Sequence, residues 1–243
     1  MTPNELSEKI KDWEYVKDKI FFALEPRNRV EEVTAKTNND EYVTVPMGSE
    51  QLCLVYKIKI DEPVAGIPAK PDSALMDTFV KASWLKNWEG GEGVEDLFGL
   101  AIKNMETMFP AEIDKLPNFL NQIVPGTCTG PTPVDNVMLV VTNKTHICGS
   151  ATIFLPGSDA KIKEMLGCDE YWLLPSSRHE LLAVAANINV DLELLEQMVK
   201  DVNLTVDPRD ILGEEVLKYD ATRQKLEPAN AHSRGERDDE KVR

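Results

Sequence analysis

The 243-residue sequence lacks the marks of a membrane or secreted protein. Its longest apolar runs are far too short to span a bilayer, and residues 1–5 do not resemble a signal peptide. Its four cysteines (Cys53, Cys128, Cys148 and Cys168) have no framework spacing, so we expect reduced, mostly buried thiols. These absences predict a cytoplasmic protein that does not associate with membranes.

The sequence also has too little positive charge to favour a nucleic acid partner. It carries 27 Lys and Arg against 42 Asp and Glu, a formal net charge of -15, and has no basic patch for phosphates. An acidic protein can mimic DNA, but no single acidic run here is long enough to suggest this. A solvated acidic surface that aids solubility is the simpler interpretation, so we expect no nucleic acid binding.

Motifs for nucleotide cofactors and metals are missing as well. There is no Gly-x-x-x-x-Gly-Lys-Ser/Thr or Gly-x-Gly-x-x-Gly, and acids that would repel phosphate surround Gly90-Gly91-Glu92-Gly93. His146-x-Cys148 places two metal-binding side chains on one strand face, and Cys128, Cys168 or His179 could converge with them. Because no Cys-x-x-Cys or His-Glu-x-x-His pattern supports this, we expect no cofactor and no metal site.

The most apolar part of the chain, residues 136–186, predicts the core of the fold. Two runs rich in β-branched residues, 137–141 and 151–155, are split by polar turn formers, which favours a β-hairpin. Two further apolar runs, 171–174 and 181–185, flank a polar corner and predict a second pair of strands.

Between these pairs of strands, Ser158 is placed to cap a short helix and Gly167 to end it. The predicted order at about residues 136–186 is therefore strand, strand, helix, strand, strand. The fold class that we predict is α+β, with a mixed or mostly antiparallel sheet flanked by helices.

Helix signals are found on both sides of this core. Thr2-Pro3-Asn4-Glu5 is a capping box with proline at the first helical position. Apolar spacing predicts two more helices, from about residue 72 to 88 and from 94 to 108. Asp191 is placed to cap another, whose predicted buried stripe is Leu195, Met198, Val199 and Val202.

Residues 52–60 predict a strand with one solvated face, because Tyr56, Ile58 and Ile60 alternate with Lys57 and Lys59. A last hairpin is expected after Val216.

Residues 27–41 and 116–133 are polar or rich in proline and glycine, and they predict loops. The proline-rich segment near residue 70 predicts a boundary between an N-terminal portion of helix and strands (1–70) and an α+β core domain (71–226). Residues 227–243 are polar without apolar periodicity and predict a disordered tail.

Residues 139–151 and 173–180 contain a pattern shared with a known protein family. The string Leu-Pro-Ser-Ser-x-His-Glu is the most specific part of this pattern. This stretch resembles a family of uncharacterised proteins from clostridia, related Gram-positive bacteria and their mobile elements. The family is catalogued only as a domain of unknown function. The likeness covers about residues 93–226, and it implies a fold and a mobile-element context without supplying any chemistry.

The corner Pro175-Ser176-Ser177-Arg178-His179-Glu180 is the sharpest candidate for chemistry. Ser176 or Ser177 could act as a nucleophile with His179 as the base and Glu180 orienting the ring. Against this, triad members usually come from separate elements, and no Gly-x-Ser-x-Gly elbow occurs. Serine hydroxyls also suit a structural corner, because they satisfy free backbone groups.

The sequence therefore favours a non-catalytic interaction or regulatory protein. We expect it to bind an unidentified protein partner through residues 175–180, and the sequence does not predict its oligomeric state. The alternative is a hydrolase using His179 with Ser176 or Ser177. A cleft beside His179, with a serine in hydrogen-bond reach of the ring, would favour that alternative.

Overall fold

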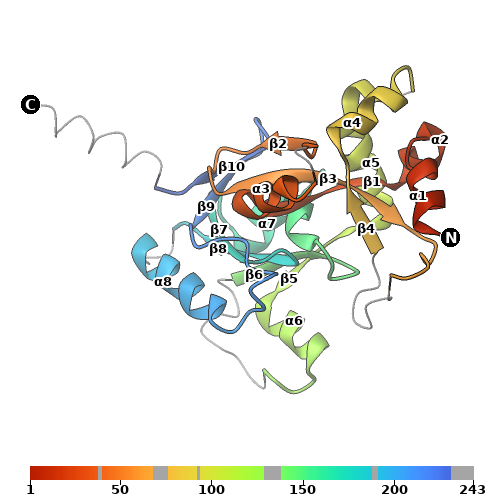
Figure 1. Ribbon diagram of the computed structural model, residues 1–243. Coiled ribbons are helices and arrows are strands. Elements are labelled where there is room, and N and C mark those ends of the chain that lie inside the picture. The colour runs from red at the N-terminus through yellow and green to blue at the C-terminus, as the bar shows by residue number, and fades with distance from the viewer. Residues whose placement is uncertain (38–39, 68–75, 92–93, 129–137, 188–190, 231–243) are drawn as a thin grey trace, which may run out of the picture.

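The computed structural model describes residues 1–37, 40–67, 76–91, 94–128, 138–187 and 191–230. Within these ranges the strands form two antiparallel sheets, which lie one above the other in Figure 1. The smaller sheet has the order β1-β3-β2, and β4 also pairs with β3. Its strands are β1 (Ile20–Pro26), β2 (Thr44–Pro46), β3 (Leu52–Ile60) and β4 (Met76–Phe79).

The larger sheet has the order β10-β9-β7-β8-β6-β5, and neighbouring strands are antiparallel throughout. Strand β6 therefore has β5 on one edge and β8 on the other. The strands are β5 (Ala111–Lys115), β6 (Met138–Asn143), β7 (Tyr171–Ser177), β8 (Glu180–Ala185), β9 (Leu217–Asp220) and β10 (Lys225–Pro228).

Helices cover and connect the sheets, so the predicted α+β class is confirmed. The α-helices are α1 (Pro3–Lys9), α2 (Trp13–Val16), α3 (Arg27–Ala35), α4 (Ala82–Leu85), α5 (Leu97–Met108), α6 (Leu116–Ile123), α7 (Ser158–Leu166) and α8 (Leu192–Asn203). The 3-10 helices are η1 (Lys17–Lys19), η2 (Lys86–Trp88), η3 (Val94–Asp96) and η4 (Gly149–Phe154).

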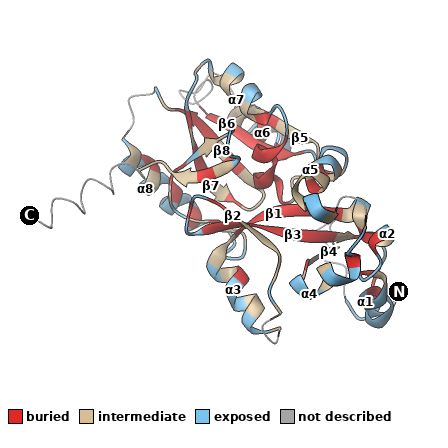
Figure 2. Cartoon of the chain, turned by 90° about the horizontal axis from the view of Figure 1, so that it is seen from above, coloured by how far each residue is buried: buried red, intermediate tan, exposed pale blue. Residues whose placement is uncertain are grey.

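One apolar cluster contains buried side chains of both sheets, such as Ile58 of β3 and Leu139 of β6. Phe22 of β1 stacks on Phe98 of α5 and meets Phe154 of η4 edge-on, with ring centroids 5.2 and 5.9 Å away. A second cluster joins α8 to the other face of the larger sheet, and a third joins α3 to the smaller sheet. Figure 2 shows the buried residues concentrated in the strands.

Several predicted elements are confirmed where the sequence carries local signals. The capping box of α1 is present, because the Thr2 hydroxyl accepts from the Glu5 amide while the Glu5 carboxylate accepts from the Thr2 amide. Helix α7 ends at Gly167 in the left-handed conformation, as predicted. Its N-cap is Gly157, however, and the Ser158 hydroxyl donates instead to the carbonyl of Thr152.

The predicted first hairpin of the core is wrong, because residues 149–154 form η4 instead of a strand. Both edges of β6 are occupied by β5 and β8, so no edge remains for a partner from residues 151–155. The Thr152 hydroxyl lies 3.0 Å from the carbonyl oxygen of Thr142 and 2.6 Å from that of Gly149. The core order is therefore strand, 3-10 helix, α-helix, strand, strand.

The predicted helix over residues 72–88 is also wrong. Residues 68–75 lie outside the described part, and Met76–Phe79 form β4, which pairs with β3 beyond the end of β2. Only residues 82–88 are helical, as α4 and η2. The predicted loops at 27–41 and 116–133 contain α3 and α6, both of which begin directly after a strand.

The buried stripe predicted for α8 is half right. Leu195 and Val199 are buried against the larger sheet, whereas Met198 and Val202 are exposed. Asp191 caps the helix as predicted, by accepting from the Glu193 amide.

The predicted tail begins later than residue 227, because Glu227 and Pro228 belong to β10. Residues 231–243, and the predicted domain boundary near residue 70, lie outside the described part of the chain.

The expectation that Lys57 faces solvent is wrong. Its side chain is 2% exposed, and its ammonium lies 2.8 Å from the carboxylate of Glu25, which is 1% exposed. The carboxylate of Asp77 lies 3.7 Å from the same ammonium. Because Glu25 and Asp77 are far from Lys57 in sequence, the alternation in β3 could not reveal this pairing.

We predict that Lys57→Met destabilises the protein by about 3 kcal/mol, because it leaves the Glu25 carboxylate buried without its closest cation. Lys59→Met is the matched control, since Lys59 lies on the same strand and pairs with Asp61 at the surface. That change should cost less than about 1 kcal/mol. Chemical denaturation measures both, and equal losses in the two variants would contradict a special role for Lys57.

Candidate functional site

The corner singled out by the sequence connects β7 to β8. Ser177 pairs with Glu180. The pairing register of β7 with β8 shifts between Leu174 and Ser177, which marks a bulge or irregularity in the ladder. The backbone amide of His179 donates to the Ser177 hydroxyl at 3.0 Å, and the Ser176 hydroxyl donates to the Glu180 carboxylate at 3.2 Å. Both serine hydroxyls therefore bond to groups of the corner itself.

The ring of His179 is held by residues from outside the corner. Its Nδ1 accepts from the backbone amide of Cys148 at 3.3 Å, and its Nε2 lies 3.4 Å from a carboxylate oxygen of Asp210. This arrangement fixes the neutral tautomer that carries the proton on Nε2. In the described structure neither serine hydroxyl is hydrogen-bonded to the ring, so the contacts do not support a serine–histidine pair.

The start of η4 packs directly beneath the corner. A Cβ at Gly149 would lie 2.5 Å from the carbonyl oxygen of His179 and 2.9 Å from the backbone nitrogen of Asn143. The Thr142 and Ser150 hydroxyls donate to the carbonyls of His179 and Arg178, both at 2.8 Å. The backbone of the corner is thus bound to β6 and η4, which a purely structural corner requires.

The positively charged guanidinium of Arg178 extends from the corner toward the smaller sheet. Its guanidinium lies 3.8 Å from a carboxylate oxygen of Glu25 and 3.8 Å from one of Asp210. Its backbone amide donates to the carbonyl of Asp210 at 2.8 Å. Glu25 and Lys57 of the smaller sheet and Arg178 of the β7–β8 corner therefore form one buried charge network, named here the junction network.

The charges of the junction network shift one another's pKa values. Burial alone would raise the pKa of Glu25, but Lys57, Arg178 and Arg29 together hold it below the ordinary value of 4.5. Burial alone would lower the pKa of Lys57, but the negative groups around it raise it above its ordinary value. Both side chains are therefore charged at neutral pH.

Cys148 lies against the junction network. Its sulfur is 3.7 Å from the guanidinium of Arg178, and its backbone is left-handed with φ 52°. Burial raises the pKa of its thiol, although Lys57 and Arg178 oppose this effect. A buried, protonated thiol is a poor nucleophile, so the position does not favour cysteine catalysis.

His146 and Cys148 were expected on one strand face, but β6 ends at Asn143, before both of them. The ring of His146 lies 3.6 Å from the carboxylate of Glu112 and packs beside Phe119. Among the described residues, no group of three His, Cys, Asp or Glu side chains is placed to hold a metal ion. The four cysteines are free thiols, of which Cys53 and Cys148 are buried.

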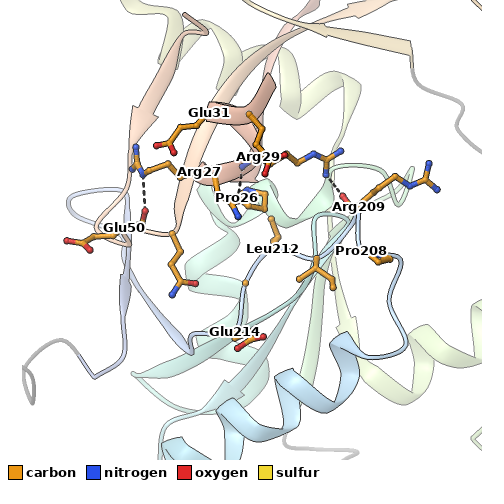
Figure 3. A pocket seen from close by; sticks show the side chains of 14 residues that line it. Pro26, Arg27, Arg29, Glu31, Glu50, Pro208, Arg209, Leu212 and Glu214 are labelled. Atoms are coloured by element: carbon orange, nitrogen blue, oxygen red, sulfur yellow. Dashed lines mark hydrogen bonds between the residues drawn. The ribbon is translucent and has the colours of Figure 1, made fainter. Parts of the chain in front are cut away.

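A cleft of about 800 Å³ opens between α3 and the residues on either side of Asp210. It is lined by the beginning of α3, by residues 50–51, by residues 208–209 and by residues 211–214, and it is drawn in Figure 3. None of the residues 175–180 lines this cleft. The corner and the cleft are therefore separate candidate sites that share the segment around Asp210.

A family of unknown function (DUF5688) matches residues 2–221. The chain belongs to this family. Searches of the curated proteins and of the solved structures found no match.

The DUF5688 match begins at residue 2 and so extends well before the region in which the sequence resemblance was found. It covers Glu25 and Lys57 of the junction network as well as the corner. No helix in the described ranges is long and apolar enough to cross a membrane.

Sequence reasoning found Arg178 and His179 but missed their partners Glu25 and Asp210, and it missed Lys57, which pairs with Glu25. One signal was available, because Glu25 follows the five apolar residues 20–24 directly. An acid at the end of such a run is a candidate for burial with a partner. The partner itself could be found only from the structure.

The low pKa of Glu25 predicts an acid-dependent stability difference between the protein and its Glu25→Gln variant. A carboxylate whose pKa is lowered by folding stabilises the protein above its unfolded-state pKa, and this contribution disappears as pH falls through the folded-state pKa. The variant should thus be less stable by about 3 kcal/mol at neutral pH. The gap should shrink as pH falls below 4.5.

Chemical denaturation of the two proteins across this pH range measures the gap. Other carboxylates titrate in both proteins and cancel in the difference. A gap that stays constant down to about pH 3 would show that Glu25 has no lowered pKa.

Proposed function

We propose that this protein is a non-catalytic interaction protein that docks a basic amphipathic helix of a partner protein on α8. The supporting observation is an exposed apolar stripe on this helix. Leu194, Met198 and Val202 are 55%, 41% and 42% exposed, and Leu204 at its C-cap is 85% exposed. They are four of the seven exposed large apolar side chains in the described ranges.

The residues of the stripe are spaced so that a second helix can pack along them. Leu194, Met198 and Val202 are each separated by four positions, so they lie in a row along one face. Leu195 and Val199, each one position after a stripe residue, are buried on the larger sheet. The apolar surface of α8 is therefore wider than its packing on the sheet uses, and the unused part suits side-by-side packing of a second helix.

Charge indicates the chemistry of the partner. Asp191 and Asp201 lie three positions from stripe residues, and both are exposed. Across the helix, four acids including the N-cap outnumber the single base Lys200. With a net charge of -15 on the whole chain, a basic helix would be attracted and an acidic one repelled.

The corner at residues 175–180 is a weaker surface for this role. Its backbone, its serine hydroxyls and the ring of His179 all have partners within the protein. Binding through the corner and hydrolysis through His179 stay predictions from the sequence. The cytoplasmic location and the clostridial, mobile-element setting belong to this proposal too, and they rest on composition and on the family resemblance.

The proposal predicts that a synthetic Leu/Lys amphipathic helix binds the protein and that an otherwise identical Leu/Glu helix does not. The double variant Leu194→Glu, Met198→Glu should weaken binding at least about tenfold, because it places two charges in the apolar contact. Fluorescence anisotropy of the labelled peptides measures the affinities. Because the contact is partly electrostatic, added salt should weaken it.

Ile123→Glu is the matched control, since Ile123 is an equally exposed apolar residue on α6. It should leave peptide binding unchanged. Equal binding of both peptides, or equal loss in both variants, would contradict the proposal. So would a wild-type dimer that the α8 variant converts to a monomer, because a second copy would then cover the stripe.

A further inference from the structure

The cleft beside α3 presents an arginine that is held in place by the backbone. The Nε of Arg27 donates to the carbonyl of Glu50 at 2.9 Å, and its Nη2 donates to that of Leu52 at 3.4 Å. Its backbone amide also donates to the carbonyl of Gln51 at 2.8 Å. The side chain is therefore positioned by neutral carbonyls, which do not compensate its charge.

Arg27 differs in this respect from the other arginines of the cleft. Arg29 donates to the carbonyl of Arg209 and lies 3.8 Å from the buried carboxylate of Glu25. Arg209 pairs with Asp207 at 2.7 Å. No carboxylate lies within ion-pair distance of Arg27 in the described ranges. Of its five guanidinium donors two are used, which leaves three for a ligand.

Acids at the rim of the cleft limit what this ligand can be. Glu31 and Glu50 lie on the same side as Arg27 in Figure 3, and Glu214 lies at the opposite end. All three are exposed, and none has an ion pair within the described residues. A polyanion would be repelled by these carboxylates, whereas a ligand with one carboxylate and one ammonium group complements both kinds of charge.

We propose that this cleft binds a short peptide with free termini. The C-terminal carboxylate accepts a bidentate pair of hydrogen bonds from Arg27, a geometry that the planar guanidinium favours. The N-terminal ammonium lies among the rim carboxylates. A cleft of about 800 Å³ is larger than a single amino acid requires and is in the range of sites for larger ligands. This proposal is independent of docking on α8.

Tetra-alanine with free termini is the probe, and isothermal titration calorimetry is the measurement. Amidation of the C-terminus should weaken binding at least about tenfold, because it removes the charge that Arg27 recognises. Acetylation of the N-terminus should weaken it less, because the rim is solvated. These comparisons use the unaltered protein, so they hold even where a variant fails to fold.

The variant Arg27→Gln should lose binding of the free peptide to the level of the amidated one. Arg27→Lys should be intermediate, because an ammonium keeps the charge without the planar fork. Arg223→Gln is the control, since Arg223 is an exposed arginine that pairs with Asp220 and Glu227 outside the cleft. It should bind like the wild type.

Three results would overturn the proposal. The first is no detectable binding of the free peptide, and the second is equal binding of the free and amidated peptides. The third is binding of inorganic phosphate that matches the peptide in affinity and in dependence on Arg27, which would show a general oxyanion site.

Discussion

Glu25 and Lys57 form a buried ion pair in the smaller sheet, and Arg178 reaches Glu25 from the corner that joins β7 to β8 in the larger sheet. Ionised groups this deeply buried are costly to desolvate, and they persist only when they are paired. Apolar packing between the sheets is not directional, so it tolerates small shifts of one sheet over the other. The contact of Arg178 with Glu25 is directional, and we infer that it helps to fix how the sheets are aligned.

This buried network accounts for the contacts that several of the chain's reactive residue types make at the corner. Arg178 reaches Glu25 from the corner, which hydrogen bonds of Thr142, Cys148 and Ser150 hold against β6 and the start of η4. The thiol of Cys148 is enclosed in the same place and kept protonated. The two proposals rest instead on surfaces outside this network, the exposed stripe of α8 and the cleft beside Arg27.

The sequence predicted elements correctly where the signals were local. The predictions were wrong where the structure of a segment depends on pairing with segments distant in sequence. Caps, glycine stops and period-3.6 patterns located α1, α5, α7 and α8. Residues 151–155 look like a strand, yet both edges of β6 were already taken by segments distant in sequence. Lys57 was predicted to face solvent because the alternation of apolar and charged residues shows which face of the strand a side chain is on. The alternation does not show which other elements cover that face. His179 was found, but its ring partners Cys148 and Asp210 come from separate loops.

The measurement that tests this account most directly is a double-mutant cycle on Glu25 and Arg178. Unfolding free energies of the wild type, Glu25→Gln, Arg178→Gln and the double variant are compared at neutral pH. If the pair joins the two sheets, the losses should be non-additive, with a coupling energy of about 1–3 kcal/mol. Additive losses, within about 0.5 kcal/mol, would show that the two side chains do not depend on each other, and the sheets would then be aligned by apolar packing alone.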